Sequence, residues 1–176
     1  MALSLPPPGT YKIDVGESGV AFDTTHLFGL GKVHGTMSFS SGSVEVGEPL
    51  EASSLAATLD ATSFSTSNTA RDKAVLSPRF LDAAQFPTFA FASSGFRQAG
   101  PTWSVDGTLS VKGAAAPVPF EIESVVVLEA GFRATATGVI DRTEFGVTKA
   151  KGMASRRLTC TVTIAAHLES LLLPPH

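Results

Sequence analysis

The sequence predicts an all-β domain in which antiparallel strands form a barrel or a two-sheet sandwich. Apolar residues recur at every second position in segment after segment, which is the period of a strand with one buried face. Turn residues separate these segments at short intervals, at Gly16, Ser41–Ser43, Gly47–Pro49, Gly100 and Gly131 among others, as antiparallel connections require. Such strands must cover their inward faces, and a closed barrel of about eight of them is either filled by side chains or holds one small ligand.

About eight or nine strands are predicted, each justified by the same alternation. Early in the chain, Val20 and Phe22 alternate with Ala21 and Asp23, and the last strand alternates apolar residues with threonines over 158–166. In chain order the strands are expected at 11–14, 20–23, 33–39, 55–59, 89–92, 103–112, 118–122, 132–136 and 158–166.

One stretch, from Thr66 to Gln85, lacks the alternation. Asn68 can cap a helix, residues 69–76 tolerate one, and the Ser77-Pro78 pair ends it, after which a second short turn can follow. We therefore expect one or two short helices near residues 69–84, inserted between two strands.

The composition predicts a dry interior. The 176 residues include 12 Phe against 1 Trp and 1 Tyr, so almost every aromatic ring lacks a polar group. Charged residues make up 16% of the chain, below the roughly 25% of an average soluble protein. The net charge of −3 includes no basic cluster of the kind that nucleic-acid binding needs, and no apolar run is long enough for a membrane span. We expect neither nucleic acid nor a membrane span.

Motifs for catalysis and metal binding are missing from the sequence. There is no nucleophile elbow, phosphate-binding glycine loop or zinc-protease motif, and the four histidines and Cys160 have no metal-ligand spacing. Cys160 lies in an alternating strand and is expected in the core. The first nine residues lack a basic segment and contain three prolines, so we expect no signal peptide and a cytoplasmic location.

Several segments carry a family resemblance. The most specific runs from Ser63 to Ser94 and contains the Arg71-Asp72 pair; Tyr11–Asp14 precedes it and Ile140–Val147 follows. In this order they resemble the YceI-like family, lipocalin-like polyisoprenoid-binding proteins of bacteria, over about residues 10–168. The resemblance implies an antiparallel lipocalin-like barrel of about eight strands. From the sequence itself, the Pro-rich segment at 1–9 and the C-terminal tail at 169–176 are expected to be extensions of this domain.

The resemblance also implies a function: non-enzymatic binding, sequestration or transport of an isoprenoid lipid, either a polyprenyl chain or an isoprenoid quinone. The bound lipid would be the ligand, with no separate cofactor. Departures from the family's usual residues occur at Glu17-Ser18, Ala74 and Phe86, where the family often has histidine or tyrosine. Any head-group role of those side chains does not transfer to this chain.

The predicted ligand contacts divide into an apolar lining and a few polar groups. The apolar candidates are Phe22, Phe28, Val33, Phe39, Leu59, Phe64, Phe89, Phe91, Leu109 and Phe145. Ordinary core packing is the alternative for each of them. The candidates for polar or head-group contacts are His26, Arg71 and Arg142, and a structural salt bridge is the alternative for the two arginines.

Two other functions stay open at this point. The protein could be an enzyme acting on an isoprenoid or quinone-like compound inside the barrel, with His26 or Arg142 assisting proton transfer. It could also be a stress-associated structural or interaction module with a filled core, forming a homodimer through the apolar tail at 171–173.

Overall fold

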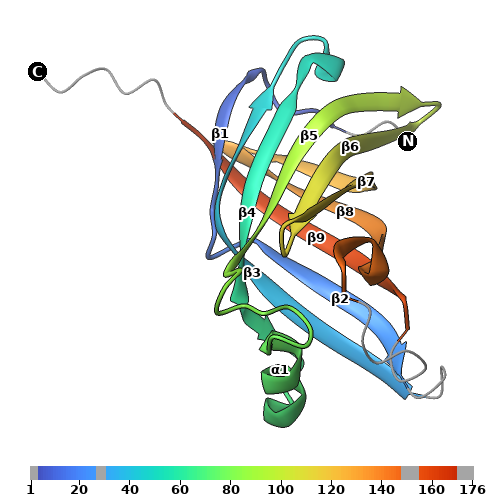
Figure 1. Cartoon of the computed structure of the whole chain (residues 1–176). Helices are drawn as coiled ribbons and strands as arrows, with labels where there is room; N and C mark the ends of the chain where they lie inside the picture. The colour runs from blue at the N-terminus through green and yellow to red at the C-terminus, as the bar shows by residue number, and fades with distance from the viewer. Residues whose placement is uncertain (1–3, 27–30, 148–154, 170–176) are drawn as a thin grey trace, which may run out of the picture.

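The computed structural model describes residues 4–26, 31–147 and 155–169, and the side chains of Thr25 and His26 are not described. This part of the chain forms nine strands, one α-helix and two 3₁₀ turns (Figure 1). The elements are β1 (Gly9–Ile13), β2 (Gly19–His26), β3 (Gly31–Val46), η1 (Leu50–Ala52), β4 (Ser54–Ser65), α1 (Thr69–Leu76), β5 (Thr88–Ala99), β6 (Thr102–Val111), β7 (Ala114–Leu128), β8 (Gly131–Asp141), η2 (Arg142–Phe145) and β9 (Arg157–Leu168).

The nine strands occupy eight positions of a closed antiparallel barrel. Each strand from β3 to β8 pairs with the strand that follows it in the chain, so the sheet continues without a break from β3 to β9. The remaining position is shared, since β1 and β2 each pair with both β3 and β9. The predicted lipocalin-like barrel of about eight strands is therefore confirmed, and the sandwich alternative is wrong.

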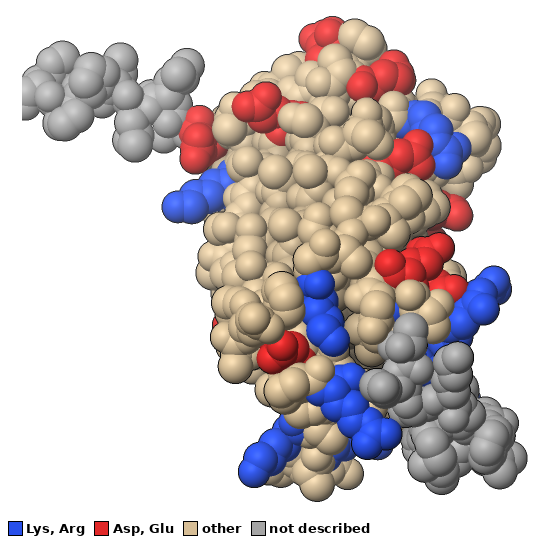
Figure 2. Space-filling model, viewed as in Figure 1, with Lys and Arg blue, Asp and Glu red and all other residues tan. Residues whose placement is uncertain are grey.

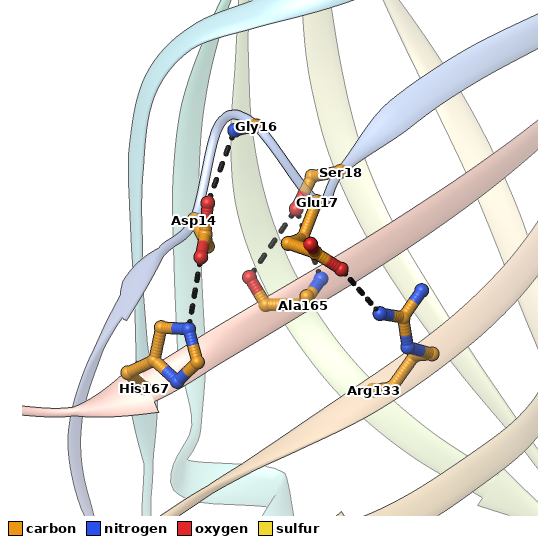
Figure 3. A network of polar contacts seen from close by, with 7 residues as sticks. All are labelled: Asp14, Gly16, Glu17, Ser18, Arg133, Ala165 and His167. Carbon is orange, nitrogen blue, oxygen red and sulfur yellow. Dashed lines mark hydrogen bonds and ion pairs between the residues drawn. The ribbon is translucent and has the colours of Figure 1, made fainter.

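Ser18 joins the two strands that share one position (Figure 3). Between β1 and β2 the chain turns away from β9, which would leave the Ala165 amide without an acceptor on that side. The Ser18 hydroxyl donates to the Ala165 carbonyl over 3.2 Å and accepts from the Ala165 amide over 2.9 Å. The Asp14 amide donates to the same carbonyl over 2.8 Å. One hydroxyl thus takes the place of a missing backbone partner.

Two ion pairs flank this join on the outer surface (Figure 3). Nε2 of His167 lies 3.0 Å from Oδ2 of Asp14, and Nη2 of Arg133 lies 2.9 Å from Oε2 of Glu17. The hydrogen bond from His167 is the main reason that the pKa of Asp14 lies below its usual value. Both pairs are largely solvent-exposed, so we expect them to contribute little stability.

The expected turn at Ser41–Ser43 is wrong, because β3 continues through it to Val46. A Cβ atom on Gly42 would lie 2.5 Å from Cδ1 of Ile13 on the neighbouring strand β1. The glycine is therefore explained by a close side-chain approach within the sheet, with a register shift between Phe39 and Ser41 beside it.

The helical insertion is confirmed as one helix. The side chain of Asn68 caps α1 by accepting from the amide of Arg71, and the helix ends at Ser77, as predicted. The expected second turn from Arg79 is a series of hydrogen-bonded turns rather than a helix. No side chain of α1 is fully buried, although half-buried Leu76 packs against the core.

The buried core lies along the inward faces of the strands, and Cys160 belongs to it as predicted, with 2% of its surface exposed. Among the described residues, no helix has the length and apolar character that crossing a membrane requires.

Candidate ligand-binding cavity

The barrel surrounds a cavity of about 430 Å³, a volume within the range of small-molecule sites. Its described wall is almost entirely hydrocarbon. Besides the Cys160 thiol, the polar side chains in this wall are those of Thr24, Thr66, Arg71, Arg142 and Ser155. The proposal of a completely filled core does not fit this cavity.

Nine of the ten predicted apolar residues lie in the cavity wall: Phe22, Val33, Phe39, Leu59, Phe64, Phe89, Phe91, Leu109 and Phe145. They come together because most of them lie at alternate strand positions whose side chains face the barrel interior. The tenth, Phe28, lies outside the described residues. The structure places these side chains at one cavity, and their contact with a ligand stays a prediction.

Two wall residues that the prediction missed illustrate different causes. Phe120 follows the same alternation of apolar and polar residues as its neighbours on β7. The sequence could therefore have predicted that its side chain faces the cavity. Phe80 lies in the irregular segment after α1, where no periodicity exists. Its position depends on a contact distant in sequence, since Nζ of Lys112 donates to the Phe80 carbonyl over 2.8 Å.

One end of the cavity reaches the surface beside α1. Ala74 lies in the cavity wall and is nevertheless exposed, and half-buried Val75, Phe80 and Leu81 lie in the wall with it. We call this opening the mouth and define it by Thr66, Arg71, Ala74, Val75, Phe80, Leu81 and Arg142. The opposite end is filled by buried Phe96, Trp103 and Phe132, and holds a second cavity of about 100 Å³ bordered by Leu5 and Pro6.

Arg71 is oriented at the mouth by a short hydrogen-bond chain. Its Nε donates to Oγ1 of Thr66 over 2.9 Å, and both the amide and the hydroxyl of Thr66 donate to Oδ1 of Asp72, over 2.8 and 2.6 Å. The hydroxyl bond from Thr66 is the main reason that the pKa of Asp72 is lowered. In place of the alternative that we considered, a salt bridge from Arg71 to the barrel, the structure has this bond to Thr66, the residue that follows β4.

Arg142 reaches the mouth from the opposite side, on η2. Its Nε donates to the Ser155 carbonyl over 3.0 Å and its Nη1 to the Val147 carbonyl over 2.6 Å, so the guanidinium ties together two points of the chain between η2 and β9. Asp141 begins η2 by accepting from the amide and hydroxyl of Thr143. The Thr143 hydroxyl and, more weakly, Arg156 hold the pKa of Asp141 below its usual value.

The third polar candidate and the departures from the family pattern lie in different places. His26 ends β2, and its side chain is not described. Ala74 lies at the mouth, whereas Glu17 faces outward in its pair with Arg133. Phe86 lies outside the cavity wall, beside Gly113 in the β6–β7 turn. Of these departures, only Ala74 alters the cavity wall directly.

The wall offers little chemistry besides apolar contact. Burial raises the pKa of the Cys160 thiol to about 12, so the thiol stays protonated at neutral pH and is not a nucleophile. Within residues 4–26, 31–147 and 155–169, no three His, Cys, Asp or Glu side chains gather into a metal site. The arrangement is suited to hold an apolar molecule with two arginines at the opening.

Comparison with known proteins gives a consistent result. Residues 11–170 match the family described as YceI-like domain. A UPF0312 protein of Enterobacter sp. strain 638 is 30% identical over 164 residues, covering 88% of this chain and 84% of the relative. Protein YceI of Salmonella arizonae is 29% identical over the same shares.

Two solved structures share the fold. BcnA of Burkholderia cenocepacia aligns with a TM-score of 0.74 at 22% identity, covering 87% of this chain and 98% of BcnA. A polyisoprenoid binding domain from Saccharophagus degradans, implicated in plant cell wall breakdown, aligns with a TM-score of 0.65 at 14% identity, covering 90% of this chain and 98% of that domain.

Proposed function

Since the chain belongs to the YceI-like family, we propose that it is a non-enzymatic carrier that binds an isoprenoid lipid, a polyprenyl chain or a quinone tail, inside its barrel. The observation that carries this proposal is the cavity of about 430 Å³ with an almost wholly hydrocarbon wall. The polyisoprenoid binding domain that shares the fold supports the choice of ligand class.

The free energy of such binding needs no polar anchor. Removing hydrocarbon from water contributes roughly 0.8 kcal/mol per carbon, so about ten buried carbons contribute on the order of 8 kcal/mol before the costs of association. Phenyl rings are suited to line this cavity because they carry no hydroxyl that would be left unpaired against a hydrocarbon chain. Arg71 at the mouth is placed to meet a polar head group that stays near solvent.

A carrier role is favoured over catalysis by the chemistry of the wall. The Cys160 thiol has a pKa of about 12, and the Arg142 guanidinium donates to two backbone carbonyls. A thiol with so high a pKa is not prepared to deliver a proton at neutral pH, and the Arg142 guanidinium is engaged with the backbone.

The direct test is mass spectrometry of an organic extract of the protein purified from the cells that make it. We expect an isoprenoid lipid in the extract of the wild type. Ala136→Phe should remove it, because Ala136 lies in the cavity wall and a phenyl ring there would occupy the space of the chain. The matched control, Ala90→Phe, points away from the cavity on β5 and should retain the lipid.

Two results would contradict the proposal. A natively folded protein whose extract contains no isoprenoid lipid would leave the cavity without its proposed ligand. Equal lipid content in the Ala136→Phe and Ala90→Phe proteins would place the lipid outside the barrel.

A further inference from the structure

Charged side chains are distributed unequally between the two ends of the barrel. In the view of Figure 2, basic side chains gather around the end that carries α1, and acidic side chains predominate toward the other end. The exposed acids of that other end include Glu45, Glu48, Glu51, Glu129 and Glu169.

Three acidic groups toward the mouth end contact neighbouring side chains. Asp72 accepts from Thr66, Asp141 pairs with Arg156 over 2.8 Å, and Asp23 contacts His34 over 2.8 Å. Arg156 thus compensates the negative charge of Asp141 within the protein.

Basic groups on α1 and just after it point into solvent instead. Lys73 and Arg79 are exposed, and neither takes part in the ion pairs found among the described residues. The Arg79 guanidinium lies 6.0 Å from the centre of the Phe80 ring, which itself lines the mouth. Cationic and apolar groups are therefore adjacent at the opening of the cavity.

The apolar groups of this surface are incompletely covered. No residue of α1 is buried, and Val75, Phe80 and Leu81 are only half-buried although they line the mouth. The segment is nevertheless held in place, because Lys112 donates to the Phe80 carbonyl over 2.8 Å. A fixed surface with basic groups around a partly exposed apolar opening has the properties that bind an anionic lipid interface.

We propose that this surface, which we call the α1 surface and define by Lys73, Val75, Arg79 and Phe80, docks onto anionic lipid bilayers and turns the mouth of the cavity toward them. The exposed acids at the opposite end are repelled by the same bilayer and reinforce this orientation. The purpose of docking rests on the proposed carrier function, since a lipid tail that passes directly from bilayer to cavity avoids exposure to water.

Sedimentation with phospholipid vesicles tests the proposal with the whole protein. At low salt we expect binding to vesicles of equal parts phosphatidylglycerol and phosphatidylcholine, and little binding to phosphatidylcholine alone. Each basic residue near an anionic surface contributes about five-fold in affinity, so Lys73→Gln/Arg79→Gln should bind roughly 25-fold more weakly. In 1 M NaCl, where the screening length falls to ~3 Å, wild-type binding should also be lost.

Lys12→Glu is the matched control, because it changes the net charge by the same two units at the opposite end. Lys12 is exposed on β1, next to Ser43 and His167. The control should retain vesicle binding, and circular dichroism checks that all variants are folded. Equal loss in the control would show a mere net-charge effect and overturn the proposal, as would unchanged binding of the double variant.

Failure of docking and failure of the carrier function give different results. If the wild-type protein does not bind the vesicles but its extract contains lipid, only the docking proposal is overturned. An acidic protein is then favoured as the partner of the α1 surface. Vesicle binding that depends on Lys73 and Arg79, in a protein with no extractable lipid, supports docking and contradicts the proposed ligand.

Discussion

The rings of Phe91 and Phe120 meet edge to face, with centroids 5.5 Å apart and planes at 84°. Each ring lies across a glycine of a neighbouring strand, Phe91 across Gly107 and Phe120 across Gly138. Phe91 packs against the cluster of Phe96, Trp103 and Val105 as well as against the residues around the larger cavity. We infer that this ring pair forms the inner end of the cavity, and that the two glycines leave room for it.

Gly107→Ala should destabilise the protein by about 1–3 kcal/mol, the usual cost of overpacking a core. The added Cβ would lie 2.3 Å from Cζ of Phe91 and 2.8 Å from the Ala92 carbonyl oxygen, so both ring and backbone must shift. Urea unfolding measures the difference. Gly95→Ala is the control, because no heavy atom lies within 4 Å of its added Cβ. Equal stability of the two variants would contradict this account of the ring pair.

Ser18→Ala should lower the free energy of unfolding by about 1–2 kcal/mol, because it leaves the Ala165 amide without its acceptor at the join of β1 and β2. Thermal and urea unfolding provide the measurement. Ser43→Ala, an exposed serine within β3, should have almost no effect. If the two serine variants were equally stable, solvent would be an adequate substitute for the Ser18 hydroxyl.

Alternation predicted most of the barrel because it reports a local property: which side chains of a strand face inward. It identified Phe89 and Phe91 correctly as inward residues for this reason. It gave no information on β1 and β2 sharing one position, since that depends on their register with β9. It also misassigned Gly42 to a turn, because a glycine that admits Ile13 looks the same in sequence as one that bends the chain.

The mouth was less predictable than the cavity. Arg71 and Arg142 were recognised through the family resemblance, and the structure brings both to one opening. Phe80 joins them only because the segment after α1 folds over the cavity, held by Lys112 from a distant turn. Such contacts leave no periodic trace in the sequence.

Asp72→Ala should destabilise the protein in a pH-dependent way. The folded-state pKa of Asp72 is lowered, chiefly by the Thr66 hydroxyl, so its contribution is fully present above the unfolded-state pKa of about 3.9 and is lost as pH falls through the lowered value. The difference between wild type and variant should therefore be constant near neutral pH and shrink in acid. Unfolding measured between neutral pH and strong acid checks this. Thr66→Val should weaken the same pH dependence. A difference in free energy of unfolding between wild type and Asp72→Ala that grew in acid would contradict a lowered pKa of Asp72.

Cys160 gives a chemical measure of how well the cavity wall excludes solvent. Its thiol is 2% exposed, and burial raises its pKa to about 12. Against an unfolded pKa near 8.5, the reactive thiolate at pH 7 is rarer by roughly a thousand-fold or more in the folded protein. Ellman's reagent should thus react roughly a thousand-fold more slowly with the native protein than with the protein in denaturing urea. Rapid reaction of the folded protein would mean that water and reagent enter freely through the mouth, and such a cavity would be a poor site for a hydrocarbon chain.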